Sequence, residues 1–189
     1  IHDDELGEWR REDTEPKEEV IITLTRNGYA KRVGTDTYRR QHRGGVGKRG
    51  QRMTKEDDIT PFLQVANTHD YLLFFTDRGR VFRCRVFDLP PDQSRNSRGT
   101  PVVKLGFNIE VREQTHAMIA VSSLLEDTYL VMVTKRGQIK RMHLPLLRNM
   151  NRSGLKFFNL KEDDDLVGAC LINADQDVVL ATQLGLSIR

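Results

Sequence analysis

One short motif occurs four times along this 189-residue chain, and it constrains the possible folds more than any other feature. Its copies are TRNGYAKR, TDRGRVFR, TKRGQIKR and TQLGLSIR, which begin at residues 25, 76, 134 and 182. Each has Thr, then Gly three residues later, then Arg four residues after Gly, and successive glycines are 51, 58 and 48 residues apart. A period near fifty is typical of propellers and related arrays. Because the last copy stops at Arg189, we expect only the start of a fourth unit.

Each motif glycine lies between two runs that have the composition of β-strands. The preceding runs, VIITLT, YLLFFT, YLVMVT and VVLAT, are apolar, whereas YAKRV, RVFRCRV and QIKRMHL mix apolar and charged residues. Two such runs around a short Gly turn predict a hairpin. Asn27-Gly28 predicts a type I′ turn, with positive φ at both residues, and the turns at Gly79 and Gly137 fit a three-residue loop. A further hydrophobic run in each unit completes an all-β fold of units 19–67, 68–125, 126–174 and an incomplete 175–189.

The two kinds of strand are expected at different depths. Runs before the glycine are apolar on both faces, which favours the interior of a stack of blades. Runs after it are half polar, and their cations can protect a sheet edge or contact phosphate. The repeated Arg itself can pair with an acid of the neighbouring unit or meet phosphate on a rim, and its position alone does not decide. The repeated Thr is interpreted as a turn-closing hydroxyl without a functional role.

Charge is segregated along the sequence although the net charge is only +3. Residues 1–19 contain nine acidic and three basic side chains, whereas residues 26–55 contain ten Lys or Arg and one acid. Between residues 135 and 161 there are eight basic side chains and no acid. Clusters of this size that recur with the repeat indicate a polyanion partner, and a solvated basic face is the alternative.

Other functional classes find little support in the sequence. No apolar stretch approaches the length of a membrane span, and the five His lack metal-ligand spacing. The acidic runs at 57–58 and 163–165 are expected as solvated turns rather than a magnesium site. Cys84 and Cys170 are expected to be buried free thiols. The GxGxxG at 45–50 lacks a βαβ frame, so we expect no nucleotide site, metal, cofactor or catalytic residue in this segment.

The richest stretch follows the first hairpin and reads DTYRRQHRGGVGKRGQRMTK, residues 36–55. Glycines alternate there with Arg and Lys. Glycine lets the backbone approach a phosphate closely and direct its N–H groups toward it, and Arg adds bidentate hydrogen bonds to phosphate oxygens. The loop therefore predicts a phosphate-binding segment.

This loop, placed after a TRNGYAKRV hairpin, resembles the glycine- and arginine-rich box of the C-terminal domain of DNA gyrase A. The family's box reads Gln, two basic residues, Gly-Gly, a basic residue and Gly. Matching positions are Gln41, Arg43, Gly44, Gly45 and Gly47. His42 and Val46 replace expected basic residues, and Lys48 and Arg49 restore charge close by. Residues 1–18 are similar to the acidic linker from the family's cleavage core, and all four repeats resemble its blades.

The resemblance implies a β-pinwheel, a propeller-like disc whose blades exchange strands with their neighbours. The chain then corresponds to about three blades and the start of a fourth, out of six. It implies sequence-nonspecific binding, bending and wrapping of double-stranded DNA around a basic rim, which gives gyrase its negative-supercoiling bias. The segment itself is not an enzyme in this reading, because the catalytic and ATP sites of the ATP-dependent type IIA topoisomerase lie elsewhere.

The implied partners are double-stranded DNA, the cleavage core of the same polypeptide and DNA gyrase B in an A2B2 assembly, in a bacterial cytoplasm near the nucleoid and without a membrane. One alternative is the corresponding C-terminal domain of topoisomerase IV, which selects DNA geometry in decatenation and relaxation. Another is a propeller-type scaffold that binds an acidic protein tail.

The predicted DNA-binding residues combine the box with the rim cations of the later units. They are Arg39, Arg40, Gln41, Arg43, Gly44, Gly45, Gly47, Lys48, Arg49, Arg52, Lys31, Arg32, Arg83, Arg85, Arg95, Arg98, Lys140, Arg141, Arg148, Arg152 and Lys156.

Overall fold

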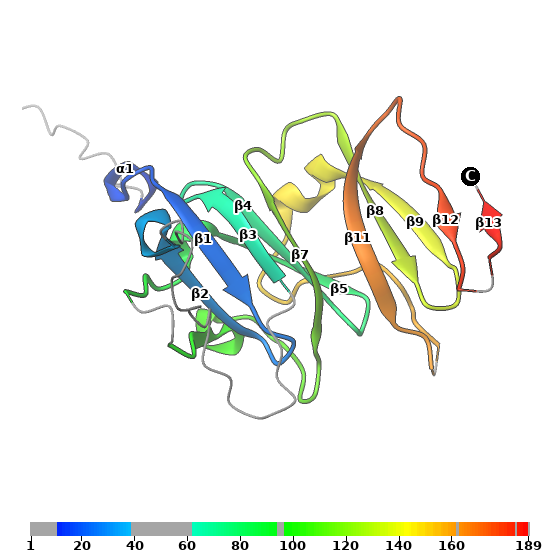
Figure 1. Ribbon diagram of the computed structural model, residues 1–189, viewed down its shortest axis with the longest axis horizontal. Coiled ribbons are helices and arrows are strands. Elements are labelled where there is room, and N and C mark those ends of the chain that lie inside the picture. Colours follow the sequence, from blue (N-terminus) through cyan, green and yellow to red (C-terminus); the bar gives the residue numbers. More distant parts are fainter. Residues whose placement is uncertain (1–10, 39–61, 94–96, 162, 184, 189) are drawn as a thin grey trace, which may run out of the picture.

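The computed structural model describes residues 11–38, 62–93, 97–161, 163–183 and 185–188. Antiparallel sheets lie side by side along the long axis of the molecule (Figure 1). This arrangement confirms the all-β, propeller-like prediction. The described helices are all short, and they are α1 (Arg11–Thr14) and the 3-10 turns η1 (Thr35–Tyr38), η2 (Val86–Asp88), η3 (Val102–Leu105) and η4 (Leu144–Asn149).

The first sheet has the order β3-β1-β2-β6. Its strands are β1 (Glu19–Leu24), β2 (Tyr29–Gly34), β3 (Phe62–Asn67) and β6 (Thr100–Pro101). The hairpin β1–β2 is the one predicted around the first motif glycine. The edge strand β6 comes from much later in the chain, so this sheet is completed by the second repeat.

The second sheet repeats this order as β10-β5-β4-β7. Its strands are β4 (Tyr71–Thr76), β5 (Arg80–Arg85), β7 (Thr115–Val121) and β10 (Leu155–Lys156). Here β10 belongs to the third repeat and pairs with β5. Each of these two sheets therefore borrows a two-residue edge strand from the following repeat, which is the strand exchange expected of a pinwheel.

The third sheet has the order β11-β8-β9, and a two-stranded ladder follows it. The strands are β8 (Thr128–Thr134), β9 (Ile139–His143), β11 (Leu166–Asn173), β12 (Leu180–Ala181) and β13 (Ser187–Ile188). Within the described residues, no strand pairs with the outer side of β9.

Close backbone approach explains where the exchanged strands attach. Gly99 and Gly154 precede β6 and β10, and both have left-handed backbones, with φ of 84° and 75°. A Cβ on Gly99 would lie 2.7 Å from the carbonyl oxygen of Ala30, and one on Gly154 would lie 2.7 Å from that of Val81. Only glycine fits at these two contacts without displacing the strand on which the exchanged segment lies.

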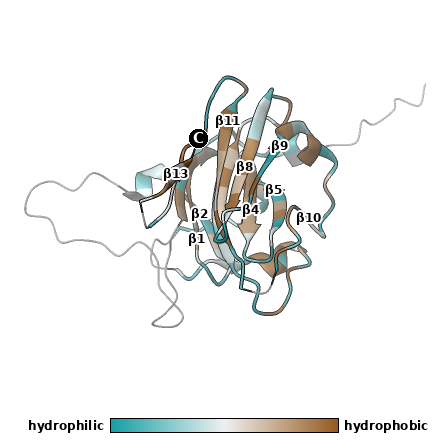
Figure 2. Ribbon diagram, turned by 90° about the vertical axis from the view of Figure 1, so that its right-hand side faces the viewer, coloured by the Kyte–Doolittle hydropathy of each residue, from teal (hydrophilic) through white to brown (hydrophobic). Residues whose placement is uncertain are grey.

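The core consists of two apolar layers between successive sheets. On β4, Leu72 and Phe74 face the first layer, whereas Leu73 and Phe75 face the second. All four are at most 2% exposed. Such two-sided burial confirms the prediction for β4, whereas the run before the fourth glycine, which contains β12, is half-buried or exposed, with Val179 66% exposed. Figure 2 shows the hydrophobic colour concentrated in strands such as β8, and the hydrophilic colour in the connecting loops.

The four motif turns share one hydrogen-bond pattern. In each, the glycine N–H donates to the threonine carbonyl three residues earlier at 2.9–3.0 Å, and the glycine φ lies between 68° and 82°. Asn27 is not among the described non-glycine residues with positive φ. The type I′ prediction is therefore wrong, because all four turns are three-residue loops that end on a left-handed glycine. The threonine hydroxyl accepts a backbone N–H in the first, third and fourth turns, as expected.

The second turn uses its threonine differently. Thr76 Oγ1 donates to Glu113 at 2.5 Å, and Arg80 Nε donates to the same carboxylate at 2.9 Å. Asp164 holds the equivalent position in the third sheet, because it lies two residues before β11 as Glu113 lies two residues before β7, and it accepts the Arg136 N–H at 3.0 Å. Asp164 is only 4% exposed. The expectation of a solvated turn is wrong for this acid, since it anchors a hairpin.

The two cysteines differ in burial, and both are free thiols. Cys84 is buried in the first core layer, and burial raises the pKa of its thiol. Cys170 is exposed on β11, which corrects the expectation that it is buried. Alternation along β11 turns its side chain outward, while Leu171 next to it packs against the second core layer.

Candidate nucleic-acid interface

Eleven of the predicted DNA-binding residues lie outside the described residues, and their role stays a prediction. They are Arg39, Arg40, Gln41, Arg43, Gly44, Gly45, Gly47, Lys48, Arg49, Arg52 and Arg95. The other ten fall on β2, β5, β9, β10 and the segments beside them, and they divide into exposed, half-buried and buried groups.

Exposed basic side chains follow one another along β9, η4, β10 and the loop between the last two, and we call them the basic surface. We define it by five exposed cations: Lys140, Arg141, Arg148, Arg152 and Lys156. The other basic residues between 135 and 161 are exposed as well, and the sequence there contains no acid. Cations without nearby acids produce a positive potential that attracts and orients a polyanion.

Aromatic stacking holds one guanidinium of the basic surface in place. The Cζ of Arg141 lies 4.5 Å from the ring centroid of Tyr129, on the neighbouring strand of the hairpin. Among the described residues, Arg141 makes no ion pair with an acid. Lys140 Nζ donates to the carbonyl of Phe157 at 2.6 Å, so it also fixes the segment after β10.

Arg83 and Arg85 flank Tyr71 in the second sheet. Their Cζ atoms lie 5.5 Å and 3.6 Å from the ring centroid of Tyr71. Arg83 Nη1 donates to the carbonyls of Leu147 and Arg148, at 2.9 and 2.5 Å. Arg83 therefore binds backbone carbonyls of the next repeat and holds η4 against the second sheet, and it makes no ion pair with an acid among the described residues. Its contact with phosphate stays a prediction.

A cavity of about 550 Å³ opens beside these two arginines. Its lining includes Tyr71, Arg83, Arg85 and Arg152, together with the carboxylates Glu12 and Asp88. Three guanidinium groups on one concave surface can contact anionic oxygens. One of them, Arg85, already pairs with Glu12.

Lys31 and Arg32 are buried rather than placed on an outer surface. Arg32 Nε donates to the carbonyl of Leu89 at 2.7 Å, and its Nη2 pairs with Glu15 at 2.6 Å. Arg32 therefore pairs with an acid, but this acid belongs to the segment before β1 and not to the neighbouring unit as expected. Lys31 is 1% exposed, and burial lowers the pKa of its ammonium, with partial compensation from Asp92. The expected surface position of these two residues is corrected, because the loop before β6 covers β2.

Arg98 extends from that loop onto Tyr29. Its Cζ lies 4.3 Å from the ring centroid, and its Nη2 donates to the tyrosine hydroxyl at 2.6 Å. The side chain of Arg98 is exposed. An arginine therefore lies over a tyrosine in each of the first three repeats.

These stacking tyrosines were not identified as site residues from the sequence. The available signal was that Tyr71 and Tyr129 each begin the apolar run before a motif glycine. Gly99 and Gly154 were missed too, although NSRG and NRSG are similar peptides at corresponding places in successive repeats.

Two further observations limit the chemistry of the described part. It contains no group of three His, Cys, Asp or Glu side chains arranged to hold a metal ion. None of its helices is both long and apolar enough to cross a membrane.

The fold and the basic surface define a propeller-like, strand-exchanging domain with an electropositive outer side. The chain belongs to the family of the DNA gyrase C-terminal domain, described as a beta-propeller, whose profile matches residues 19–66, 70–113 and 128–172. It is 39% identical over 178 residues to DNA gyrase A of Clostridium acetobutylicum, which covers 94% of this chain and 21% of that protein. It is 40% identical over 183 residues to DNA gyrase A of Mycobacterium bovis, which covers 97% of this chain and 22% of that protein. The chain thus spans about a fifth of the relatives it matches.

Solved structures agree on the fold. The C-terminal domain of DNA topoisomerase IV superposes with a TM-score of 0.70 at 27% identity, over 92% of this chain and 51% of that one. The DNA gyrase A C-terminal domain gives 0.68 at 22% identity, over 90% and 53%. Both contain roughly twice as much chain as this one covers.

Proposed function

We propose that this chain binds, bends and wraps double-stranded DNA without sequence preference, as the C-terminal module of a gyrase-type topoisomerase. It acts together with the cleavage core of its own polypeptide and DNA gyrase B in an A2B2 assembly, in a bacterial cytoplasm near the nucleoid. Wrapping presents a crossed DNA segment to the core and favours negative supercoiling. Strand cleavage and ATP hydrolysis belong to the other parts of the enzyme.

The observation that carries this proposal is the basic surface. Its cations are exposed, come from a stretch without acids and extend over three consecutive elements. Phosphate neutralisation by Lys and Arg supplies most of the affinity of nonspecific DNA binding, and it requires no base contacts. The large apolar patch expected of a protein-docking face is not needed for this binding.

The salt dependence of binding tests the proposal. We expect log affinity for a duplex to fall steeply with log salt, by roughly 0.9 for each phosphate neutralised. The double variant Arg148→Ala, Lys156→Ala should reduce that slope by roughly 2. Lys17→Ala is the matched control, since it removes an exposed cation outside the basic surface and should leave the slope unchanged. A flat salt plot for the parent chain would refute DNA binding through phosphates.

A topology assay separates wrapping from simple binding. We expect that replacing Arg43, Lys48 and Arg49 with Ala abolishes the linking-number change in a ligation assay while much of the affinity remains. The double variant of the basic surface serves as the comparison, because it removes cations without touching the loop. Equal loss of affinity and wrapping in both variants would make the loop an ordinary basic patch.

The activity of the intact parent enzyme on DNA topology addresses the topoisomerase IV alternative. The likeness to the topoisomerase IV domain and the replacement of two basic box positions by His42 and Val46 favour it. A parent enzyme that relaxes and decatenates DNA without introducing negative supercoils would support that alternative over a gyrase.

A further inference from the structure

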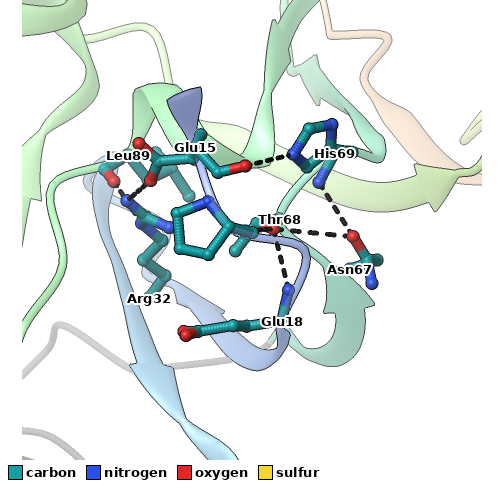
Figure 3. A network of polar contacts seen from close by, with 8 residues as sticks. Glu15, Glu18, Arg32, Asn67, Thr68, His69 and Leu89 are labelled. Atoms are coloured by element: carbon teal, nitrogen blue, oxygen red, sulfur yellow. Dashed lines mark hydrogen bonds and ion pairs between the residues drawn. The ribbon is translucent and has the colours of Figure 1, made fainter. Parts of the chain in front are cut away.

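The acidic segment before β1 is bound to the first two repeats by a series of contacts. We call residues 11–18 the strap. Glu15 pairs with buried Arg32, and its carbonyl accepts from His69 Nε2 at 2.8 Å. Thr68 Oγ1 donates to the carbonyl of Pro16 at 2.6 Å, and the Thr68 N–H donates to the carbonyl of Glu18 at 2.9 Å. Figure 3 shows Thr68 and His69, from the turn between β3 and β4, on one side of this segment and Arg32 of β2 beside the Glu15 side chain. The middle and end of the strap are therefore firmly anchored.

The start of the strap reaches a different kind of partner. Glu12 pairs with Arg85, whose Nη1 also donates to the carbonyl of His69 at 2.7 Å. The side chain of Glu12 is 39% exposed, against 21% for Arg85. Glu12 lines the cavity that also contains Arg83 and Arg152. A carboxylate thus occupies the cationic cavity at a position where a phosphate oxygen would make the same contact.

The third repeat provides an internal comparison. Arg85 lies opposite Tyr71 in the β4–β5 register, and His143 lies opposite Tyr129 in the β8–β9 register. His143 pairs with Asp127 of its own repeat at 2.9 Å. In the described residues, no strap carboxylate reaches the third repeat. Of these two repeats, only the second has the cation opposite its tyrosine paired with an acid from the strap.

We propose that the strap is a built-in competitor of DNA: Glu12 occupies Arg85 in the DNA-free protein and is displaced by duplex phosphate, while Glu15 keeps the strap attached. This inference rests on the proposed DNA binding and adds its regulation. A partly exposed ion pair is weak, so DNA, with its high density of phosphates, can displace Glu12. The more buried pair between Glu15 and Arg32 holds the strap near the site for rebinding when DNA leaves.

A double-mutant cycle tests the competition. We expect Glu12→Gln to tighten duplex binding up to about fivefold, which corresponds to about 1 kcal/mol. Arg85→Gln should weaken binding, and Glu12→Gln should give no gain in the Arg85→Gln background. Glu18→Gln is the matched control, because it removes the same charge from the same segment without an ion pair among the described residues, and its effect should stay below twofold.

Hydrogen exchange gives a second readout that does not depend on mutation. We expect a saturating duplex to accelerate amide exchange in the strap between residues 12 and 15, while the amides of Glu18 and Thr68 keep their protection. DNA-induced protection at Glu12, or a gain from Glu12→Gln that persists in the Arg85→Gln background, would overturn the competition. If the parent chain shows no salt-sensitive duplex binding, the proposed function itself fails. If it binds but the cycle shows no coupling, only the strap proposal fails.

Discussion

Removal of the negative charge of Glu113 is expected to cost the domain a large part of its stability. The side chain of Glu113 is fully buried, and that of Arg80 is 13% exposed. The carboxylate accepts hydrogen bonds from Thr76, from Arg80 and from the backbone N–H of Glu110. Loss of one partner of a buried pair typically costs 3–5 kcal/mol. Because Arg80 retains some contact with solvent, we expect about 3 kcal/mol for Glu113→Gln.

The pH dependence of this effect has a definite sign. Burial alone would raise the pKa of Glu113, but the hydrogen bonds from Arg80, Thr76 and the Glu110 N–H outweigh it and bring the pKa below its ordinary value of 4.5. The unfolded chain then binds the proton more readily than the folded chain. The stabilisation from the carboxylate is complete above pH 4.5 and is lost as the pH falls through the lower folded-state pKa. The deficit of Glu113→Gln relative to the parent should shrink over that interval.

Chemical and thermal unfolding at several pH values measure both effects. At neutral pH a loss of about 3 kcal/mol corresponds to a fall in Tm of roughly 6–12 °C for a chain of this size. The control is Glu110→Gln, which breaks a pair with Arg78 whose side chains are about half exposed and should change stability by less than about 0.5 kcal/mol. A Glu113→Gln protein within 0.5 kcal/mol of the parent, or a deficit that persists unchanged in acid, would refute the reasoning.

Three further changes test other parts of the structure. Both Gly154 and Gly137 have left-handed backbones, but only at Gly154 would a Cβ meet backbone atoms. In urea unfolding, Gly137→Ala should cost about 1–2 kcal/mol and Gly154→Ala should cost more; equal losses would contradict the close approach of Gly154 to the Val81 carbonyl. Arg32→Lys keeps the charge but cannot bind the Leu89 carbonyl and Glu15 at the same time, so we expect about 1–2 kcal/mol less stability with unchanged duplex affinity. A variant that stays stable but binds DNA more weakly would indicate that Arg32 contacts phosphate. Burial lowers the pKa of Lys31 from 10.5, so the stability of the parent relative to Lys31→Met should rise as the pH rises toward 10.5, and a flat difference would argue against it.

The hairpins and their stacking could be predicted from sequence because they depend on local patterns. The runs before each glycine contain almost no polar residue, and such apolar runs are typical of strands that are buried on both faces. Burial of Leu72 and Leu73 in opposite layers follows directly from such a pattern. The type I′ expectation failed because a dipeptide preference is weaker than the hydrogen bonds that the repeated threonine makes around every turn.

The exchanged strands could not be predicted in the same way. β6 and β10 are two residues long, which is too short for any periodicity. Their pairing depends on the glycine directly before each strand, which fits against the carbonyl of a residue far away in the sequence, Ala30 or Val81. The buried acids escaped prediction for a related reason. Asp164 lies in a run of three aspartates, and only the register of the third sheet shows that one of them faces a hairpin while its neighbours are exposed.

Strand exchange also determines how the basic surface relates to the second sheet. Phe157, just after β10, donates its N–H to the carbonyl of Gly79 at 2.8 Å, and its own carbonyl accepts the ammonium of Lys140. Arg83 of β5 holds the carbonyls of η4. The third repeat therefore cannot rotate against the second without breaking these bonds. These bonds fix the basic surface relative to the second sheet, which β10 completes. If the proposed DNA binding holds, we expect the packing of the blades to set the path of the bound duplex, so changes at Gly154 should alter DNA geometry although no charge is removed.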